Sequence, residues 1–133
     1  MNNAENWDHA WFGVWKETGP VFKKCPSIHE FIDEKVTDYR DKDKILEYLE
    51  KAQVVATTSR LSFPCVLTKK KFTGSLSYRT DGIWLWPDDL AYYVREHHVR
   101  LPVKMLETIR QNSYTPPTVS LETIQTLERP PIA

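Results

Sequence analysis

Residues 75–102 read SLSYRTDGIWLWPDDLAYYVREHHVRLP, and this stretch decides the fold. Its first part, 75–80, alternates between small polar and larger side chains, which is the period-two pattern of a β-strand. The pair Asp81-Gly82 follows, and an apolar run, 83–86, comes directly after it. An Asp-Gly pair between two such runs is a strong hairpin signal, because a type I′ turn needs positive φ at both central residues. We therefore predict an antiparallel hairpin over residues 78–86 with a two-residue turn.

The second strand of this hairpin is apolar at every position. Trp84 and Trp86 are two residues apart, so a regular strand places both on one face and Ile83 and Leu85 on the other. Because both faces are apolar, we expect the strand to be covered on two sides, with a helix over one of them.

Two helices are predicted after the hairpin. Pro87 suits the first turn of a helix, where its missing N–H is not needed, and Asp88 and Asp89 favour the positive end of the helix dipole. This helix is expected to run to about His98, and Pro102 opens the next one. The residues predicted to face inward are Leu90, Tyr93, Val94 and His97 in the first helix and Met105, Leu106 and Ile109 in the second.

The first part of the chain also has helical patterns. Three Trp and one Val at helical spacing predict an amphipathic helix over residues 4–18, ended by Gly19-Pro20. Ser27 and Glu30 form a capping box, which predicts the start of a second helix. The apolar face of that second helix would consist of Ile28, Phe31, Ile32 and Val36.

The middle of the chain changes from a helix to a strand. A third helix is expected to begin near Asp41 or Asp43. Its buried stripe would consist of Ile45, Leu46, Leu49 and Ala52. The β-branched run Val54–Thr58 then predicts a strand, and Thr118–Leu127 is open between strand and helix.

The chain has 133 residues, of which 41% are hydrophobic and 12% aromatic. A domain of this size buries about two thirds of the surface that its unfolded chain exposes, so one core suffices. We therefore predict a single α+β domain over residues 1–133, with flexible ends at 1–5 and 128–133. Its small antiparallel sheet would contain the 78–86 hairpin and would be packed by about four to five helices.

Both cysteines are expected to be free thiols in a cytoplasmic protein. No apolar run approaches the roughly 18 residues of a membrane span, and the polar N-terminus has no signal-peptide core. A reducing compartment keeps Cys25 and Cys65 unpaired. Nothing local to Cys65 predicts a lowered thiol pKa, and a zinc site that combines both cysteines with His97 has no spacing to support it.

No catalytic constellation is recognisable in the sequence. Two neighbouring residues of a helix point about 100° apart, so His97 and His98 cannot bind one ion from one face. Asp81 suits a turn, and Asp88 and Asp89 suit a helix start, which explains them without general acid–base catalysis. Glycine-rich phosphate loops are also missing. We expect no enzymatic activity, no metal site and no cofactor, and keep an enzyme that uses Asp81, Asp88 or His97 as a less favoured alternative.

Charge is balanced overall but segregated along the chain. The totals are 18 Lys+Arg and 18 Asp+Glu, and a nucleic-acid binder usually has a basic excess. Residues 1–50 carry 7 basic and 11 acidic side chains (net −4), residues 51–80 carry 6 and none (+6), and residues 81–133 carry 5 and 7 (−2). These segments are either solvated faces of one domain or a polarised surface that steers a charged protein partner. The acidic segments disfavour single-stranded nucleic acid at the basic middle.

A family resemblance adds a function to this interpretation. The motif TDG-W-WP over residues 80–87, then YYV over 92–94 and H-LP over 98–102, resembles a group of small uncharacterised bacterial proteins. Some of these look like immunity proteins of contact-dependent or polymorphic toxin systems. The resemblance implies a protein that binds a cognate toxin domain and blocks it by occlusion, and it transfers no catalytic residue. A non-catalytic regulatory or scaffold module for protein binding is the alternative.

The acidic helical surface is the first choice for the contact face, because of the charge segregation and the resemblance. It consists of Glu30, Asp33, Glu34, Asp38, Asp41, Asp43 and Glu47. The oligomeric state is left open.

Overall fold

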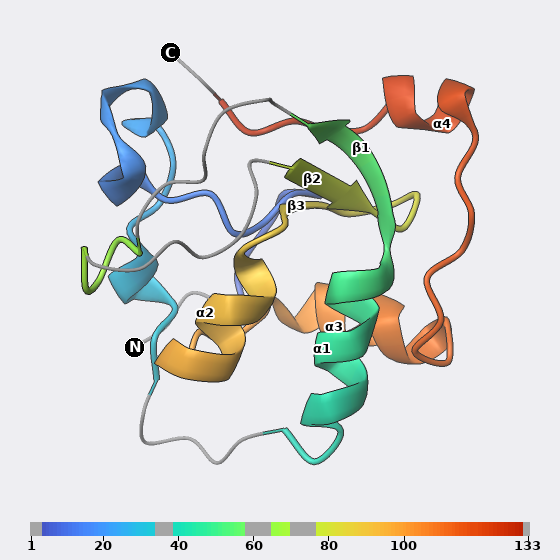
Figure 1. The fold of residues 1–133 in the computed structure, drawn as a ribbon, viewed down its shortest axis with the longest axis horizontal. Helices are drawn as coiled ribbons and strands as arrows, with labels where there is room; N and C mark the ends of the chain where they lie inside the picture. Colours follow the sequence, from blue (N-terminus) through green and yellow to red (C-terminus); the bar gives the residue numbers. More distant parts are fainter. Residues whose placement is uncertain (1–3, 34–38, 58–64, 70–76, 132–133) are drawn as a thin grey trace.

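The computed structural model describes residues 4–33, 39–57, 65–69 and 77–131. This part of the chain contains a three-stranded antiparallel sheet in the order β1-β2-β3 and four α-helices (Figure 1). The strands are β1 (Gln53–Thr57), β2 (Ser77–Thr80) and β3 (Leu85–Pro87), and the helices are α1 (Lys42–Lys51), α2 (Leu90–His97), α3 (Val103–Gln111) and α4 (Leu121–Gln125). The predicted α+β class is confirmed, with the number of α-helices at the lower end of the expectation.

The hairpin is confirmed, but its turn differs from the prediction. Thr80 pairs with Leu85, so four residues, 81–84, form the loop instead of two. Gly82 is the only one of the four with positive φ, at 96°. The prediction of a two-residue type I′ turn is therefore wrong, because such a turn needs positive φ at two adjacent residues.

Side chains close this loop. The Asp81 carboxylate accepts hydrogen bonds from the backbone N–H groups of Ile83 (3.0 Å) and Trp84 (2.8 Å). The Thr80 hydroxyl accepts from the Gly82 N–H (3.0 Å) and donates to the Trp84 carbonyl (2.7 Å). Asp side chains stabilise turns by bonding backbone groups two residues on, so the Asp-Gly pair predicts the place of the turn but not its length.

Both faces of β3 are covered, as predicted, but Ile83, predicted on the same covered face as Leu85, lies in the loop before β3 with 57% of the residue exposed. Trp84 and Trp86 belong to the main core cluster. Leu85 lies in a smaller cluster with Trp11, Val14 and Cys25. The helix over the first face is α1, since the indole of Trp86 stacks on Tyr48 of α1 with ring centroids 6.2 Å apart.

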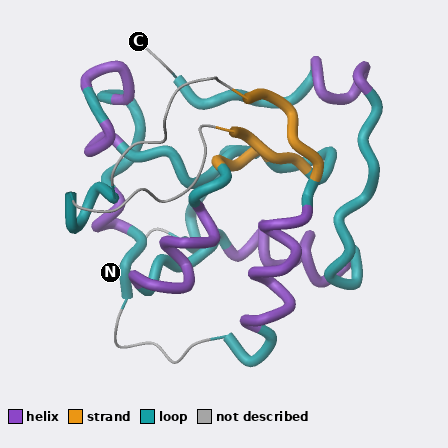
Figure 2. Tube along the Cα trace, viewed as in Figure 1, coloured by secondary structure: helices purple, strands orange, loops and turns teal. Residues whose placement is uncertain are grey.

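Helices α1, α2 and α3 lie together on one side of the sheet, whereas α4 stands apart (Figure 1). A long irregular connection, residues 112–120, leads from α3 to α4 (Figure 2). The inward residues of the three packed helices are buried as predicted, with the exception of the partly buried His97. They are Ile45, Leu46 and Leu49 in α1, Leu90, Tyr93 and Val94 in α2, and Met105, Leu106 and Ile109 in α3.

The predicted helix over residues 4–18 is wrong. Residues 10–12 run extended beside β3 instead, with hydrogen bonds from the Phe12 N–H to the Leu85 carbonyl and from the Leu85 N–H to the Ala10 carbonyl, both 3.0 Å. Neighbouring side chains enter opposite clusters, as in a strand: Trp11 joins the small cluster and Phe12 the main one. Pairing with the edge of β3 satisfies backbone groups that an exposed edge strand leaves open.

Gly13 is a second reason for this difference. Its φ is 98°, and a Cβ placed there would lie 3.0 Å from Cδ of Pro87 and 3.1 Å from Cδ1 of Leu90. The chain thus approaches β3 and α2 closely at a conformation that favours glycine. A single 3₁₀ turn, Lys16–Thr18, is the helical structure that remains in this stretch.

The capping box at Ser27 is confirmed, but it caps only one 3₁₀ turn, Ile28–Glu30. After that turn the chain is again extended, since Ile32 forms a bridge with Val99 and the Arg100 N–H donates to the Phe31 carbonyl at 2.8 Å. Val36 lies outside the described residues. The predicted second helix is therefore wrong within the described residues. Ile28 is buried as part of the 3₁₀ turn, and Phe31 is buried next to the bridge of Ile32 with Val99.

The remaining elements differ from the predictions only at their ends. Helix α2 begins at Leu90, because Pro87 still belongs to β3. The open segment 118–127 contains α4, whose N-cap Ser120 accepts a hydrogen bond from the Thr123 N–H at 3.2 Å. At the chain ends, the Ala4 carbonyl accepts from the Val103 N–H (3.1 Å).

Candidate functional site

Two of the seven predicted contact residues have structural roles next to the 3₁₀ turn. Glu30 accepts a hydrogen bond from the Ser27 N–H at 2.9 Å, which completes the capping box. The Asp33 carbonyl accepts from Nη2 of Arg100 at 3.3 Å. Glu34 and Asp38 lie outside the described residues.

The other three predicted residues lie on or beside α1. Asp41 is the N-cap residue, and Asp43 lies in the first turn. Glu47 follows Asp43 by four residues, so both project from one side of the helix. Glu47 is exposed and forms an ion pair of 2.9 Å with Lys51. The structure thus brings Asp41, Asp43 and Glu47 together and places Glu30 and Asp33 in another segment.

An open cavity of about 630 Å³ lies at this end of α1. Its lining consists of Tyr39, Arg40, Asp41, Lys42, Asp43, Lys44, Arg110 and Tyr114. We call these residues the α1 cavity. Among them are four cations and two carboxylates, because Arg and Lys alternate with Asp along residues 40–44. The described lining is therefore of mixed charge with a basic excess, although residues 1–50 as a whole are acidic.

Asp41 binds two other residues of the α1 cavity, Arg110 and Tyr114. Its carboxylate accepts hydrogen bonds from Nε (2.9 Å) and Nη2 (3.1 Å) of Arg110, and a third from the Tyr114 hydroxyl (2.6 Å). The fork of two parallel N–H bonds is the strongest arrangement of an Arg–carboxylate pair. The Arg110 guanidinium, helped by the Tyr114 hydroxyl, holds the pKa of Asp41 far below its usual range. This arrangement ties α1 to the end of α3 and the turn after it.

Both tyrosines of the α1 cavity are held in place by cations. Nζ of Lys44 lies 5.2 Å from the ring centroid of Tyr114, and the Arg100 guanidinium lies 5.2 Å from that of Tyr39. The Tyr39 hydroxyl also accepts a hydrogen bond from the Leu101 N–H at 3.0 Å, and burial raises the pKa of Tyr39. Small-molecule sites enclose most of their ligand, whereas this cavity is open to solvent.

The Asp41 ion pair predicts a specific loss of stability in acid. Because the pKa of Asp41 is lower in the folded chain than its ordinary value of 3.8, the pair stabilises the fold fully above that value, and this contribution declines as the pH falls below it. We expect Asp41→Asn to lower the free energy of unfolding by a constant amount above about pH 5 and by progressively less below it. Urea unfolding at a series of pH values measures this difference. Arg110→Gln should likewise reduce the fall in the free energy of unfolding below about pH 5. Parallel curves of unfolding free energy against pH for wild type and Asp41→Asn would contradict the assignment.

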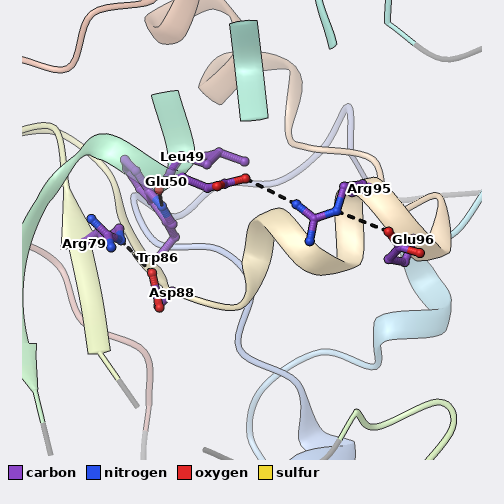
Figure 3. A network of polar contacts seen from close by, with 7 residues as sticks. All are labelled: Leu49, Glu50, Arg79, Trp86, Asp88, Arg95 and Glu96. Carbon is purple, nitrogen blue, oxygen red and sulfur yellow. Dashed lines mark hydrogen bonds and ion pairs between the residues drawn. The ribbon is translucent and has the colours of Figure 1, made fainter. Parts of the chain in front are cut away.

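A second, smaller cavity of about 270 Å³ lies between the sheet, α1 and α2. Figure 3 shows Arg79 and Asp88 turned toward each other beside Trp86, and they form an ion pair of 2.7 Å. Arg95 binds Glu50 at 3.3 Å on the other side. Arg79 also donates to the Ala52 carbonyl at 2.7 Å. Asp88 is thus used in an ion pair that joins β2 to the segment before α2.

Neither a metal-ligand group nor a membrane-spanning helix is found among the described residues. Within the described ranges, no group of three or more His, Cys, Asp or Glu side chains is arranged to hold a metal ion. None of the described helices has the length and apolar character to cross a membrane.

Sequence reasoning missed three residues of the α1 cavity, Tyr39, Arg110 and Tyr114. Tyr114 is 73 residues from Asp41, so no local pattern joins them.

No protein-family model, curated protein or solved structure matches this chain.

Proposed function

We propose that this chain is an immunity protein that binds a cognate bacterial toxin domain in the cytoplasm and blocks it by occlusion. The single observation that carries the proposal is the α1 cavity, an open surface with Tyr and Arg side chains held in fixed positions. The segregated charge along the chain and the resemblance of residues 80–102 support the same function.

Fixed Tyr and Arg side chains are well suited to protein recognition. Tyr, Trp and Arg are enriched among the residues that dominate binding energy at protein interfaces. Ordering a long side chain on binding costs about 0.5–1.5 kcal/mol. Since Asp41 already holds Arg110 and Tyr114 in the free chain, less of this ordering is left for the moment of binding.

The contact surface extends from the α1 cavity along α1. Asp43 and Glu47 are exposed there, and they are acidic members of a surface whose cavity lining has a basic excess. An interface of mixed charge selects its partner by complementarity and speeds the encounter. Occlusion requires only that this surface covers the toxin's working face, so no catalytic group is needed.

Rescue of growth tests the proposal. The toxin domain encoded by the neighbouring reading frame is expressed with and without this chain in the same host. We expect growth to be restored only when both are present, and the two proteins to co-purify. Continued growth arrest together with the absence of a complex at micromolar concentration would contradict the proposed function.

Reversal of one charge maps the contact surface. Asp43→Lys places a cation at the edge of the α1 cavity, and we expect it to weaken toxin binding about tenfold, which is about 1.4 kcal/mol. Isothermal titration calorimetry measures the change. The matched control is Glu122→Lys, because Glu122 is also an exposed acid in the first turn of a helix, α4. Equal effects of the two variants would show that the binding surface lies elsewhere.

A further inference from the structure

Cys65 lies in a short turn that is fixed to α2. The Lys69 N–H donates to the Cys65 carbonyl at 2.8 Å and closes the turn. The Val66 N–H donates to the hydroxyl of Tyr93, a buried residue of α2, at 2.9 Å. The Cys65 side chain is buried, with 0% of the residue exposed. The turn therefore holds one thiol against the surface of α2.

Three polar groups meet at this thiol. Sγ of Cys65 lies 3.6 Å from Nε2 of His97, and the same nitrogen lies 3.1 Å from the Tyr92 hydroxyl. Tyr92 and Thr68 also form hydrogen bonds with the sulfur. Both Tyr92 and His97 belong to α2 and are only partly buried.

The two buried thiols of the chain have opposite electrostatic surroundings. Burial raises the pKa of Cys25, whose Sγ lies 3.7 Å from the Pro131 carbonyl. Burial acts in the same direction at Cys65, but hydrogen bonds from Tyr92 and Thr68 outweigh it and leave the pKa of Cys65 below its usual value. Hydrogen bonds to a charged form favour that form. Cys65 is thus the more readily ionised thiol, although it is the less exposed one.

We propose that Cys65, with His97 and Tyr92, is a reactive thiol site that hydroperoxides oxidise to a sulfenic acid. The thiolate is the nucleophile in this chemistry. Its sulfur attacks one oxygen of hydrogen peroxide, the S–O bond forms as the O–O bond breaks, and hydroxide leaves. The sulfur loses two electrons and the peroxide gains them. The hydroxide takes a proton from Nε2 of His97 when that nitrogen carries one, or from water, and becomes water.

Burial selects the kind of oxidant. A sulfur without exposed surface is closed to bulky or charged thiol reagents, whereas hydrogen peroxide is neutral and not much larger than water. The site is a modification site on this chain and goes beyond the proposed toxin binding. Sulfenic acid is reversible by thiols, so the modification can be removed in a reducing compartment.

Oxidation of the native chain tests the site. The protein is treated with hydrogen peroxide, the reaction is stopped with catalase, and the chain is unfolded in denaturant that contains dimedone, which traps sulfenic acids. Peptide mass spectrometry then gives the rate at each cysteine. We expect Cys65 to be oxidised severalfold faster than Cys25, since the thiolate is the reacting form and the hydrogen bonds at Cys65 favour it. This comparison needs no variant, and equal rates or a faster Cys25 would overturn the proposal.

Two variants separate the role of His97 from a general effect on α2. His97→Asn should slow the oxidation of Cys65 severalfold and leave Cys25 unchanged. The matched control is His98→Asn: His98 has φ of 57°, a conformation that Asn tolerates well. We expect this control to react as wild type does. Tyr92→Phe, which keeps the ring, should also slow Cys65, and an unchanged rate in both Tyr92→Phe and His97→Asn would refute their part in the site.

Discussion

Asp81→Ala is expected to destabilise the protein by about 3 kcal/mol or more. The carboxylate is buried, with 2% of the residue exposed, and it accepts hydrogen bonds from two backbone N–H groups of the hairpin loop. It also accepts from the Tyr48 hydroxyl at 2.7 Å. Alanine removes both carboxylate oxygens and leaves two buried donors, the Trp84 N–H and the Tyr48 hydroxyl, without this acceptor. Each unsatisfied buried donor costs about 1–3 kcal/mol.

Asp81→Asn separates the loop from the contact with α1. Its side-chain oxygen still accepts from the loop, but the amide end presents a donor to the Tyr48 hydroxyl, which already accepts from Nδ2 of Asn112 at 2.9 Å. We therefore expect a smaller loss than for alanine. Urea unfolding, monitored by Trp fluorescence, measures the loss of stability in both variants. The control is Asp8→Ala, whose side chain is 92% exposed; a loss for Asp81→Ala no larger than for this control would contradict the role given to Asp81.

Trp86→Ala is expected to lower the free energy of unfolding by about 3–5 kcal/mol. Trp86 is among the largest fully buried side chains of the described core. Its ring stacks on Tyr48, and its Nε1 donates to the Leu49 carbonyl at 3.1 Å. The substitution therefore leaves a cavity between β3 and α1 and an unsatisfied carbonyl in α1.

Trp86→Phe divides these two effects, because it keeps a ring but loses the hydrogen bond to Leu49. We expect Trp86→Phe to lower the free energy of unfolding by less than Trp86→Ala does. Ile83→Ala is the control, since Ile83 is an apolar residue of the same hairpin with 57% of its surface exposed. In thermal and urea unfolding, the loss of stability should increase in the order Ile83→Ala, Trp86→Phe, Trp86→Ala. A loss below about 1 kcal/mol for Trp86→Ala would contradict its role in the packing of β3 against α1.

Much of the fold follows from local patterns. The hairpin, strand β1 and helices α1, α2 and α3 were predictable because their hydrophobic periodicity agrees with their surroundings. The helix predicted over residues 4–18 is wrong for a physical reason. Its Trp spacing fits a helix, but pairing with the edge of β3 buries Trp11 and Phe12 on opposite faces. Gly13 was the one local signal against a helix, and the capping box predicted a helix start without predicting its length.

The candidate site was harder to predict because its chemistry depends on contacts between distant segments. The acidic count of residues 1–50 does not reveal that Asp41 is matched by Arg110 from α3. The same holds for Cys65 and His97, which lie 32 residues apart. The predicted acidic set stays a proposal for Asp43 and Glu47. What the structure adds to it is the mixed charge and the fixed tyrosines of the α1 cavity.

The most direct test of the proposed function is an isothermal titration of the purified toxin domain from the neighbouring reading frame into this chain. The proposal predicts a saturable one-to-one complex with micromolar or tighter affinity, weakened by Asp43→Lys and not by Glu122→Lys. Absence of binding at micromolar concentration, with both proteins folded, would contradict it.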